Sequence, residues 1–277
     1  MSEGGLHVVF GTGQVGLALA DRLAGLGAEV RAVSRRRPAA LPDSVDWRGA
    51  DAIDLDAAAD AAKGASVVYQ CLNAPYTRWP ELFPPLHRGV LAAAERAGAL
   101  LVTLENVYAY GPTGGRPMTE DLPLAATTSK GRTRAAMTGE LLAASAAGGA
   151  RVAIGRASDF FGAGALATLG TDERAVGQVW HLPGPETMTT RALLDLVAAQ
   201  VGRPVVVRNV PPLVLRAMGL ASPLMRGLAE MAYEFEEPFI LDTAKFESAF
   251  GTAVTPLAIA VADTVAWYRT QAGAQGT

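Results

Sequence analysis

Short hydrophobic runs alternate with alanine-rich stretches of helical length along the first two-thirds of the chain. Most of these runs are apolar throughout, which is typical of strands that are buried on both faces of a parallel sheet. The alternation of the two kinds of segment predicts an α/β fold with a doubly wound parallel sheet of the Rossmann type. The predicted strands are Leu6–Phe10, Glu29–Val33, Val45–Ala50, Ser66–Leu72, Leu100–Glu105, Arg151–Ala157 and Gln178–Leu182.

The pattern changes in the last third of the chain, where helical segments dominate and prolines interrupt them. We therefore expect residues 1–184 to form the domain that carries the sheet, and residues 185–277 to form a smaller, mostly helical C-terminal lobe. The segments predicted in this lobe are a helix at Thr189–Val201, a short strand in VVVRNV at residues 205–210, helices interrupted at Pro212 and Pro223, and a closing helix from about Pro256 to Thr270.

Composition and charge narrow the class of protein. The 277 residues have a formal net charge of −3, so no basic excess indicates nucleic acid as a partner. The first apolar run, Leu6–Phe10, is too short for a signal peptide or a membrane span. The single cysteine, Cys71, cannot form a disulfide within the chain, which fits a reducing compartment, and we expect it to be a buried small hydrophobe. We therefore expect a cytoplasmic protein. As partners we expect a small-molecule substrate and no nucleic acid or membrane, with the chain a monomer or homodimer.

A glycine-rich loop follows the first predicted strand. It reads GTGQVG and opens a helix predicted at Gln14–Leu26. In this context the first glycine permits a tight turn, the second lets the backbone approach a pyrophosphate, and the third lets the helix pack close to the strand. Free N–H groups at the helix start then face the phosphates. The loop predicts a dinucleotide-binding site, and its residues are Gly11, Thr12, Gly13, Gln14, Val15 and Gly16.

The end of the second predicted strand indicates which dinucleotide binds. An NAD site usually has an acidic residue there, about 20 positions after the loop begins, but this chain reads VSRRRP. A guanidinium can instead form a two-pronged contact with the 2′-phosphate of NADP. We therefore expect NADP rather than NAD, with contacts from Ser34, Arg35 and Arg36, although the three arginines could also form only a solvated surface.

Other cofactor contacts follow from topology, because ligands of doubly wound sheets bind outside the carboxyl ends of the strands. Asp51 and Ala52 follow the third predicted strand, where the adenine would lie. Leu72, Asn73 and Ala74 end the fourth, beside the ribose and phosphates.

Four motifs together resemble a known family. GTGQVG, NVYAYGPTGGRPMTEDLPL, SKGRTRAAMTGELL and RASDFFGAG, in this order, are similar to the extended short-chain dehydrogenase/reductases of the NAD(P)-dependent epimerase/dehydratase type. The resemblance implies a Rossmann domain with a C-terminal substrate lobe. It also implies a catalytic serine or threonine, a tyrosine and a lysine four residues after it. At these positions the chain has Asn106, Lys130 and Arg134, so it resembles the atypical members of the family.

The replaced residues still suggest chemistry. Lys130 and Arg134 share one side of a helix predicted at Ser129–Ala147, and Arg132 does not. Arg134 can hold ribose hydroxyls but cannot give up a proton, whereas Lys130 could act as a general acid or remain a phosphate contact. Tyr108, close to both cations, would have a lowered pKa and could take the role of the missing tyrosine, or could merely pack. Asn106 would orient the substrate.

Further candidates are weaker. A substrate pocket could be lined by Tyr76, Arg78 and Trp79, which could also only cap a helix, and nicotinamide or substrate could meet Arg156, Ser158 and Asp159 at the end of the sixth strand. We expect His87 to be structural, and His181 faces the lobe. The spacing of the histidines and the cysteine fits no metal site.

The resemblance also implies about forty residues that this chain lacks after RASDFFGAG. We expect a break near Ala165 to Ala167, caused either by a naturally short chain or by an unrecorded substrate lid. In the same family, helices such as Glu81–Ala97 and Ser129–Ala147 form a dimer interface.

These observations favour an NADP-dependent oxidoreductase that moves a hydride between the nicotinamide and a carbonyl or carbinol of a small molecule. Two alternatives stay open. The chain could be a non-catalytic NADP-binding sensor or scaffold, or it could be a nucleotide-sugar epimerase or dehydratase.

Overall fold

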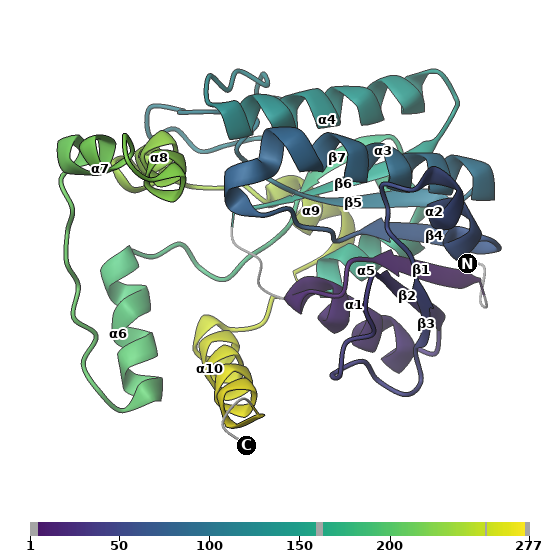
Figure 1. Ribbon diagram of the computed structural model, residues 1–277, viewed down its shortest axis with the longest axis horizontal. Helices are drawn as coiled ribbons and strands as arrows, with labels where there is room; N and C mark the ends of the chain where they lie inside the picture. The colour runs from purple at the N-terminus through teal and green to yellow at the C-terminus, as the bar shows by residue number, and fades with distance from the viewer. Residues whose placement is uncertain (1–4, 159–162, 253, 275–277) are drawn as a thin grey trace.

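The computed structural model describes residues 5–158, 163–252 and 254–274. Its centre is a seven-stranded parallel sheet with the order β3-β2-β1-β4-β5-β6-β7 (Figure 1). This confirms the doubly wound sheet and every strand predicted before residue 184, to within two residues at each end. The strands are β1 (Leu6–Phe10), β2 (Glu29–Ser34), β3 (Asp46–Gly49), β4 (Ala65–Gln70), β5 (Leu100–Asn106), β6 (Arg151–Ala157) and β7 (Gln178–His181).

Helices cover both faces of the sheet, as Figure 1 shows. One core layer packs α1 and α5 against strand residues such as Val9 and Val102. The other packs α2, α3 and α4 against alternate residues such as Val8 and Leu101. Burial on both faces explains why the strands are continuous apolar runs. These helices are α1 (Gln14–Gly25), α2 (Leu55–Ala62), α3 (Trp79–Ala97), α4 (Ser129–Ala146) and α5 (Gly164–Thr171), with short 3₁₀ turns η1 (Tyr76–Arg78) and η2 (Glu173–Ala175).

The C-terminal lobe is helical, as predicted. Pro212 and Pro223 each occupy the first position of a helix. A backbone N–H at that position has no partner within the helix, so proline starts these helices rather than breaking them. The strand predicted at residues 205–210 is wrong, since this segment pairs with no strand and lies largely exposed. The elements are α6 (Thr190–Val201), α7 (Pro212–Met218), α8 (Pro223–Glu230), η3 (Ala232–Phe235), α9 (Ala244–Phe250) and α10 (Leu257–Ala274).

The parts of the lobe lie in two places (Figure 1). α6 and α10 lie side by side, away from the sheet, and the Arg269 guanidinium donates to the carbonyl of Gln200 at 2.8 Å. α9 packs on the sheet instead, because the Phe250 ring lies 4.8 Å from the ring of Trp180 on β7. A parallel bridge between Met118 and Leu241 adds a second attachment to the Rossmann domain.

The segment around the expected break is helical. Residues 164–171 form helix α5, and Leu166, Ala167 and Leu169 are buried in the core beside α1. The joint near Ala165 to Ala167 therefore lies within a helix packed on the core, and the expected substrate lid stays a prediction. Among the residues that the structure describes, no helix is both long and apolar enough to cross a membrane.

Candidate functional site

The glycine loop has the geometry that a dinucleotide requires. Gly11 has a φ of +101°, which disfavours any side chain, and its N–H donates to Val33 O at 2.9 Å. A Cβ on Gly16 would lie 1.9 Å from the carbonyl oxygen of Gly11, so only glycine lets α1 pack this close. A Cβ on Gly13 would meet nothing within 4 Å, so the loop is open where a pyrophosphate would lie. The residues present therefore fit a dinucleotide.

Two arginine side chains stand free beside this loop. Thr12, Ser34, Arg35 and Arg36 line one open cavity at the end of β2. The Ser34 hydroxyl donates to the carbonyl of Arg36 at 2.8 Å and accepts from Trp47 Nε1 at 3.1 Å, which fixes the turn. Both guanidinium groups are exposed, and no ion pair joins either of them to another residue in the described part of the chain. The turn therefore presents two available positive charges.

The other predicted cofactor residues lie along the same edge of the sheet. Asp51 follows β3, and its carboxylate accepts from the N–H of Ile53 at 3.1 Å, while Ala52 is buried. Leu72, Asn73 and Ala74 follow β4, and the carbonyl of Ala74 accepts from Trp79 Nε1 at 3.0 Å. Their contacts with a cofactor stay a prediction.

Lys130 and Arg134 lie on the same buried side of α4, and Arg132 is exposed, as predicted. Thr128 caps this helix by accepting from the N–H of Gly131 at 3.1 Å, which fixes the first turn. The two cations therefore have fixed positions on α4, and each has partners within the protein.

Lys130 is bound by the C-terminal lobe. Its ammonium lies 2.9 Å from Glu230 Oε2 and 3.4 Å from the carbonyl of Gly227, and 4.3 Å from the centre of the Tyr76 ring. Its backbone N–H also donates to Glu230 Oε1 at 3.0 Å. A Cβ on Gly227 would lie 2.9 Å from the ammonium, so the backbone of α8 covers Lys130 directly.

Arg134 is enclosed by aromatic rings. Its guanidinium carbon lies 4.0 Å from the centre of the Phe83 ring and 4.9 Å from that of Trp79, both on α3. The side chain is buried, Nε has no hydrogen-bond partner in the described structure, and burial lowers the pKa of Arg134 to about 10. Arg134 therefore mainly stabilises the contact between α3 and α4.

Tyr108 lies at the mouth of the site, but its expected pKa was wrong. Burial, followed by the charge of Glu234, raises the pKa of Tyr108 instead of lowering it. The phenol is hydrogen-bonded to Tyr76 and its ring stacks on Trp79 at 5.6 Å. The positive charge of Lys130 is offset by its ion pair with Glu230. Asn106, at the serine position, is buried and accepts from the N–H of Tyr108 at 3.3 Å.

The lobe supplies acidic residues that the sequence analysis missed. Burial, followed by the charges of Glu234 and Glu230, raises the pKa of Tyr76 to about 12. Burial, followed by the charge of Glu234, also raises the pKa of Tyr233. Nothing in the sequence pattern indicates that these residues, about a hundred positions after Lys130, face the site. Tyr76, Tyr108 and Tyr233 with Glu230 and Glu234 are called the tyrosine cluster below.

Glu105 is a second residue that was missed, although a carboxylate at the end of an apolar strand is a signal. It is buried and lies 3.2 Å from Arg156 Nε, and the Thr138 hydroxyl lies 2.8 Å from its Oε2. Arg156 was expected to meet nicotinamide or substrate. Instead it is buried, because Glu105 pairs with it and the Tyr110 ring lies 4.8 Å from its guanidinium carbon.

Tyr110 continues this buried network to His181. The Tyr110 hydroxyl lies 2.7 Å from His181 Nε2, and His181 Nδ1 lies 2.8 Å from the carbonyl of Asp242. A carbonyl only accepts, so Nδ1 carries the proton and Nε2 accepts from the tyrosine. Burial lowers the pKa of His181, which keeps the ring neutral. The network links β5, β6 and β7 to the lobe.

The weaker candidates fall mainly on structural positions. Arg78 forms a two-pronged exposed pair with Glu81 at the start of α3, Trp79 and His87 are buried, and burial raises the pKa of Cys71 to about 12, as expected of an unreactive thiol. Ser158 lines a cavity near the lobe. Asp159 lies outside the described residues.

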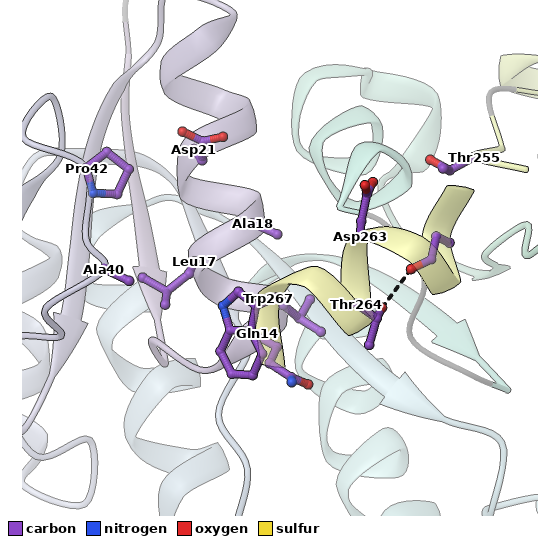
Figure 2. A pocket seen from close by; sticks show the side chains of 12 residues that line it. Gln14, Leu17, Ala18, Asp21, Ala40, Pro42, Thr255, Asp263, Thr264 and Trp267 are labelled. Atoms are coloured by element: carbon purple, nitrogen blue, oxygen red, sulfur yellow. Dashed lines mark hydrogen bonds between the residues drawn. The ribbon is translucent and has the colours of Figure 1, made fainter. Parts of the chain in front are cut away.

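A separate cavity of about 540 Å³ lies between α1 and α10. Figure 2 shows Ala18 on α1 facing α10, with Trp267 at one end and Asp21 and Asp263 at the other. Gln14 Nε2, at the start of α1, donates to the Tyr268 hydroxyl at 3.2 Å. This contact ties the last helix to the nucleotide loop.

Comparisons with known proteins agree with this geometry. The model of the NAD dependent epimerase/dehydratase family matches residues 8–180. The structure of gox2253 superposes with a TM-score of 0.77 at 19% identity, covering 96% of this chain and 98% of that one. WbmH from Bordetella bronchiseptica, in complex with NAD⁺, gives 0.73 at 17%, covering 96% and 99%. MoeE5, in complex with UDP-glucose and NAD, gives 0.72 at 20%, covering 96% and 99%. No curated protein sequence matches this chain.

Proposed function

The chain belongs to the NAD dependent epimerase/dehydratase family, and we propose that it is an NADP-dependent oxidoreductase that acts on a carbonyl or carbinol of a small molecule. This proposal rests on the guanidinium groups of Arg35 and Arg36, which lie beside the open glycine loop and form no ion pair in the described structure. Related structures such as that of WbmH hold NAD⁺. NAD is therefore the cofactor that the preference for NADP must be tested against.

The charge at the end of β2 supports NADP. An NAD site holds the ribose diol with a carboxylate, which would repel a 2′-phosphate. Here the cavity beside Thr12 is lined by Ser34, Arg35 and Arg36, and none of its described lining residues carries a carboxylate. Charge-assisted hydrogen bonds from guanidinium to phosphate are among the strongest contacts available at a protein surface.

Tyr108 is the proposed proton donor. Bound nicotinamide supplies the hydride, and the phenol of Tyr108 gives its proton to the carbonyl oxygen as the alkoxide develops. A raised pKa keeps this phenol protonated at neutral pH, and its hydrogen bond to Tyr76 fixes the hydroxyl. Asn106 holds the turn that carries Tyr108. Lys130, which is paired with Glu230, keeps the lobe in place rather than donating the proton.

Calorimetric titration with NADP and NAD tests the cofactor. We expect NADP to bind more tightly, by about tenfold for each phosphate contact of 1.4 kcal/mol. Arg35→Ala with Arg36→Ala should remove that preference, while Arg132→Ala, an exposed arginine on α4, should leave it unchanged. Equal affinity of the double variant and the wild type for NADP would refute the proposed contact.

Turnover tests the chemistry. With NADPH and a panel of ketones, we expect loss of the absorbance of the reduced nicotinamide, and a fall in kcat of about 100-fold or more in Tyr108→Phe. An unchanged kcat in Tyr108→Phe would assign the proton to another group.

One observation favours a second function, a non-catalytic NADP sensor. Both replacements of the family's catalytic pair are held by protein groups, Lys130 by Glu230 and Arg134 by the rings of Phe83 and Trp79. A sensor would bind oxidised and reduced NADP without turning over any substrate. The third reading, a nucleotide-sugar epimerase or dehydratase, is supported by family membership and by the likeness to MoeE5. Incubation with UDP-glucose and NAD, followed by chromatography of the sugar, tests it.

A further inference from the structure

A cavity of about 430 Å³ lies beyond the carboxyl ends of β6 and β7, between the sheet and the lobe. It is lined by Ser158, which directly follows β6, and by residues 184–190, which lead from β7 into α6. Leu193 on α6 and Phe235, Phe239 and Leu241 form an apolar wall on the side of the lobe. Substrates of doubly wound sheets bind at this edge.

The charge of this cavity is negative or zero. Among the described residues that line it there is no lysine or arginine, and the two that carry a charge are Glu186 and Glu247. Glu186 is exposed, and Glu247 accepts from the Thr243 hydroxyl at 2.7 Å. Lys245 is close to Glu247 in sequence but is not among the lining residues. Its ammonium donates to the carbonyl of Val179 at 2.7 Å and lies 4.2 Å from the centre of the Trp180 ring.

One feature at the cavity attracts anions. The start of α6, at Thr189 and Thr190, borders it, and a helix N-terminus carries about half a positive charge. Thr189 already satisfies one N–H there by accepting from Ala192 at 3.2 Å. Two full carboxylates outweigh half a charge, so the net field disfavours a diphosphate. A diphosphate is normally held by arginine or lysine, and the described lining of this cavity supplies neither.

We propose that this cavity binds a substrate without negative charge: a neutral or amine-bearing carbonyl compound, or its alcohol, with an apolar body. The inference rests on the proposed function for the reaction but not for the binding. The apolar body packs on Phe235, Phe239 and Leu193, and hydroxyl or amine groups meet Ser158, Thr187 and Glu247. The substrate then differs in class from the UDP-glucose that MoeE5 holds.

Three acetophenones that differ in one meta substituent test this proposal: carboxylate, hydroxymethyl and aminomethyl. Each is titrated calorimetrically into the protein with NADP present, and each is assayed with NADPH. We expect the neutral and amine compounds to bind at least about tenfold more tightly than the carboxylate. UDP, titrated in the same way, should not displace the hydroxymethyl compound.

Variants locate the effect. Glu186→Gln with Glu247→Gln should remove most of the discrimination against the carboxylate, and Thr187→Trp should block binding of all three compounds. Glu29→Gln makes the same charge change on an exposed residue at the opposite edge of the sheet and should change nothing. Equal binding of the carboxylate, displacement by UDP, failure of all three compounds to bind, or unchanged discrimination in the double variant would overturn the proposal. Binding with the expected preference but no oxidation of NADPH would reject the oxidoreductase while supporting the cavity.

Discussion

Lys130 and Glu230 form an ion pair with 2.9 Å between Nζ and Oε2, although they lie 100 positions apart in the chain. The pair joins the first turn of α4 to the end of α8. The sequence resemblance predicts that Lys130 occupies the position of a catalytic tyrosine, and in this structure Lys130 connects the Rossmann domain to the lobe. The lysine side chain is 5% exposed and that of the glutamate 21%, so solvent screens the pair only partly.

Breaking this pair should loosen the lobe. We expect Lys130→Met to lower the free energy of unfolding by about 1–3 kcal/mol, because Glu230 then keeps a half-buried charge with no cation. Urea unfolding of Lys130→Met, Glu230→Gln and the double variant gives the coupling energy. Arg132→Met, on the exposed side of the same helix, serves as the control and should stay within about 0.5 kcal/mol of the wild type. Purely additive effects would show that the pair contributes nothing.

The tyrosine cluster should make the protein sensitive to alkali. Burial raises the pKa of Tyr76 to about 12, and those of Tyr108 and Tyr233 also rise. An unfolded tyrosine loses its proton near pH 10, so above that pH the unfolded chain binds fewer protons than the folded one. Stability is therefore full below about pH 10 and falls as the pH rises through the folded values.

Urea unfolding at a series of alkaline pH values measures this effect, and phenolate absorbance gives the titration itself. Tyr233→Phe should make the loss of stability with pH less steep, because one raised group is removed. Its hydroxyl has no hydrogen-bond partner in the described structure, so the substitution itself should cost little. If all three phenols titrate near pH 10, the burial of the cluster is wrong.

All three histidines should make the protein sensitive to acid. Burial lowers the pKa of His7, His87 and His181 from 6.5. Between the folded value and 6.5 the unfolded chain binds more protons, so stability is full above about pH 6.5 and falls as the pH drops. Each histidine contributes up to about 1.4 kcal/mol per pH unit in that window.

His87→Leu offers a specific check. Neither ring nitrogen of His87 has a hydrogen-bond partner in the described structure, and the side chain is fully buried on α3. Leucine should therefore maintain or raise stability at neutral pH and reduce the loss on acidification. Unfolding curves at about pH 7 and about pH 5.5 compare the two proteins. A large loss at neutral pH would mean that His87 makes a bond through water.

The sequence was sufficient for the sheet because the signal is local and repeated. A strand such as Arg151–Ala157 is buried on both faces, so its apolar run shows its bounds directly. The same rule wrongly predicted a strand at the exposed residues 205–210, because Val205, Val206 and Val207 have high strand propensity but no partner strand. Propensity without pairing does not make a strand.

The site was predicted well where backbone geometry decides and poorly where distant side chains decide. Gly11 and Gly16 follow from the loop motif, because a turn and a close approach require glycine. The pKa of Tyr108 depends on its burial and then on Glu234, and Lys130 is fixed by Glu230. Both acids belong to the lobe and reach the site only through tertiary packing. Spacing along the chain carries no information about such contacts.

The ion pair between Glu105 and Arg156 allows a final prediction, about buried charge. Both side chains are almost fully buried, at 2% and 1% exposed, and β5 and β6 place them opposite each other in register. Glu105→Gln leaves the Arg156 guanidinium without its counter-charge inside the protein, so we expect a loss of about 3–5 kcal/mol in the free energy of unfolding. Replacing both, as Glu105→Leu with Arg156→Met, should cost less than Glu105→Gln alone, since no uncompensated charge remains.

Arg151 and Glu173 provide the matched control for this experiment. They also form an arginine–glutamate pair that begins at β6, but their side chains are 49% and 83% exposed. Glu173→Gln should cost at most about 1 kcal/mol, because solvent replaces the lost partner. Urea unfolding of the three variants and the wild type measures the comparison. If Glu105→Gln and Glu173→Gln cost the same, then water or another group reaches Arg156, and the buried network does not hold β5, β6 and β7 together as inferred.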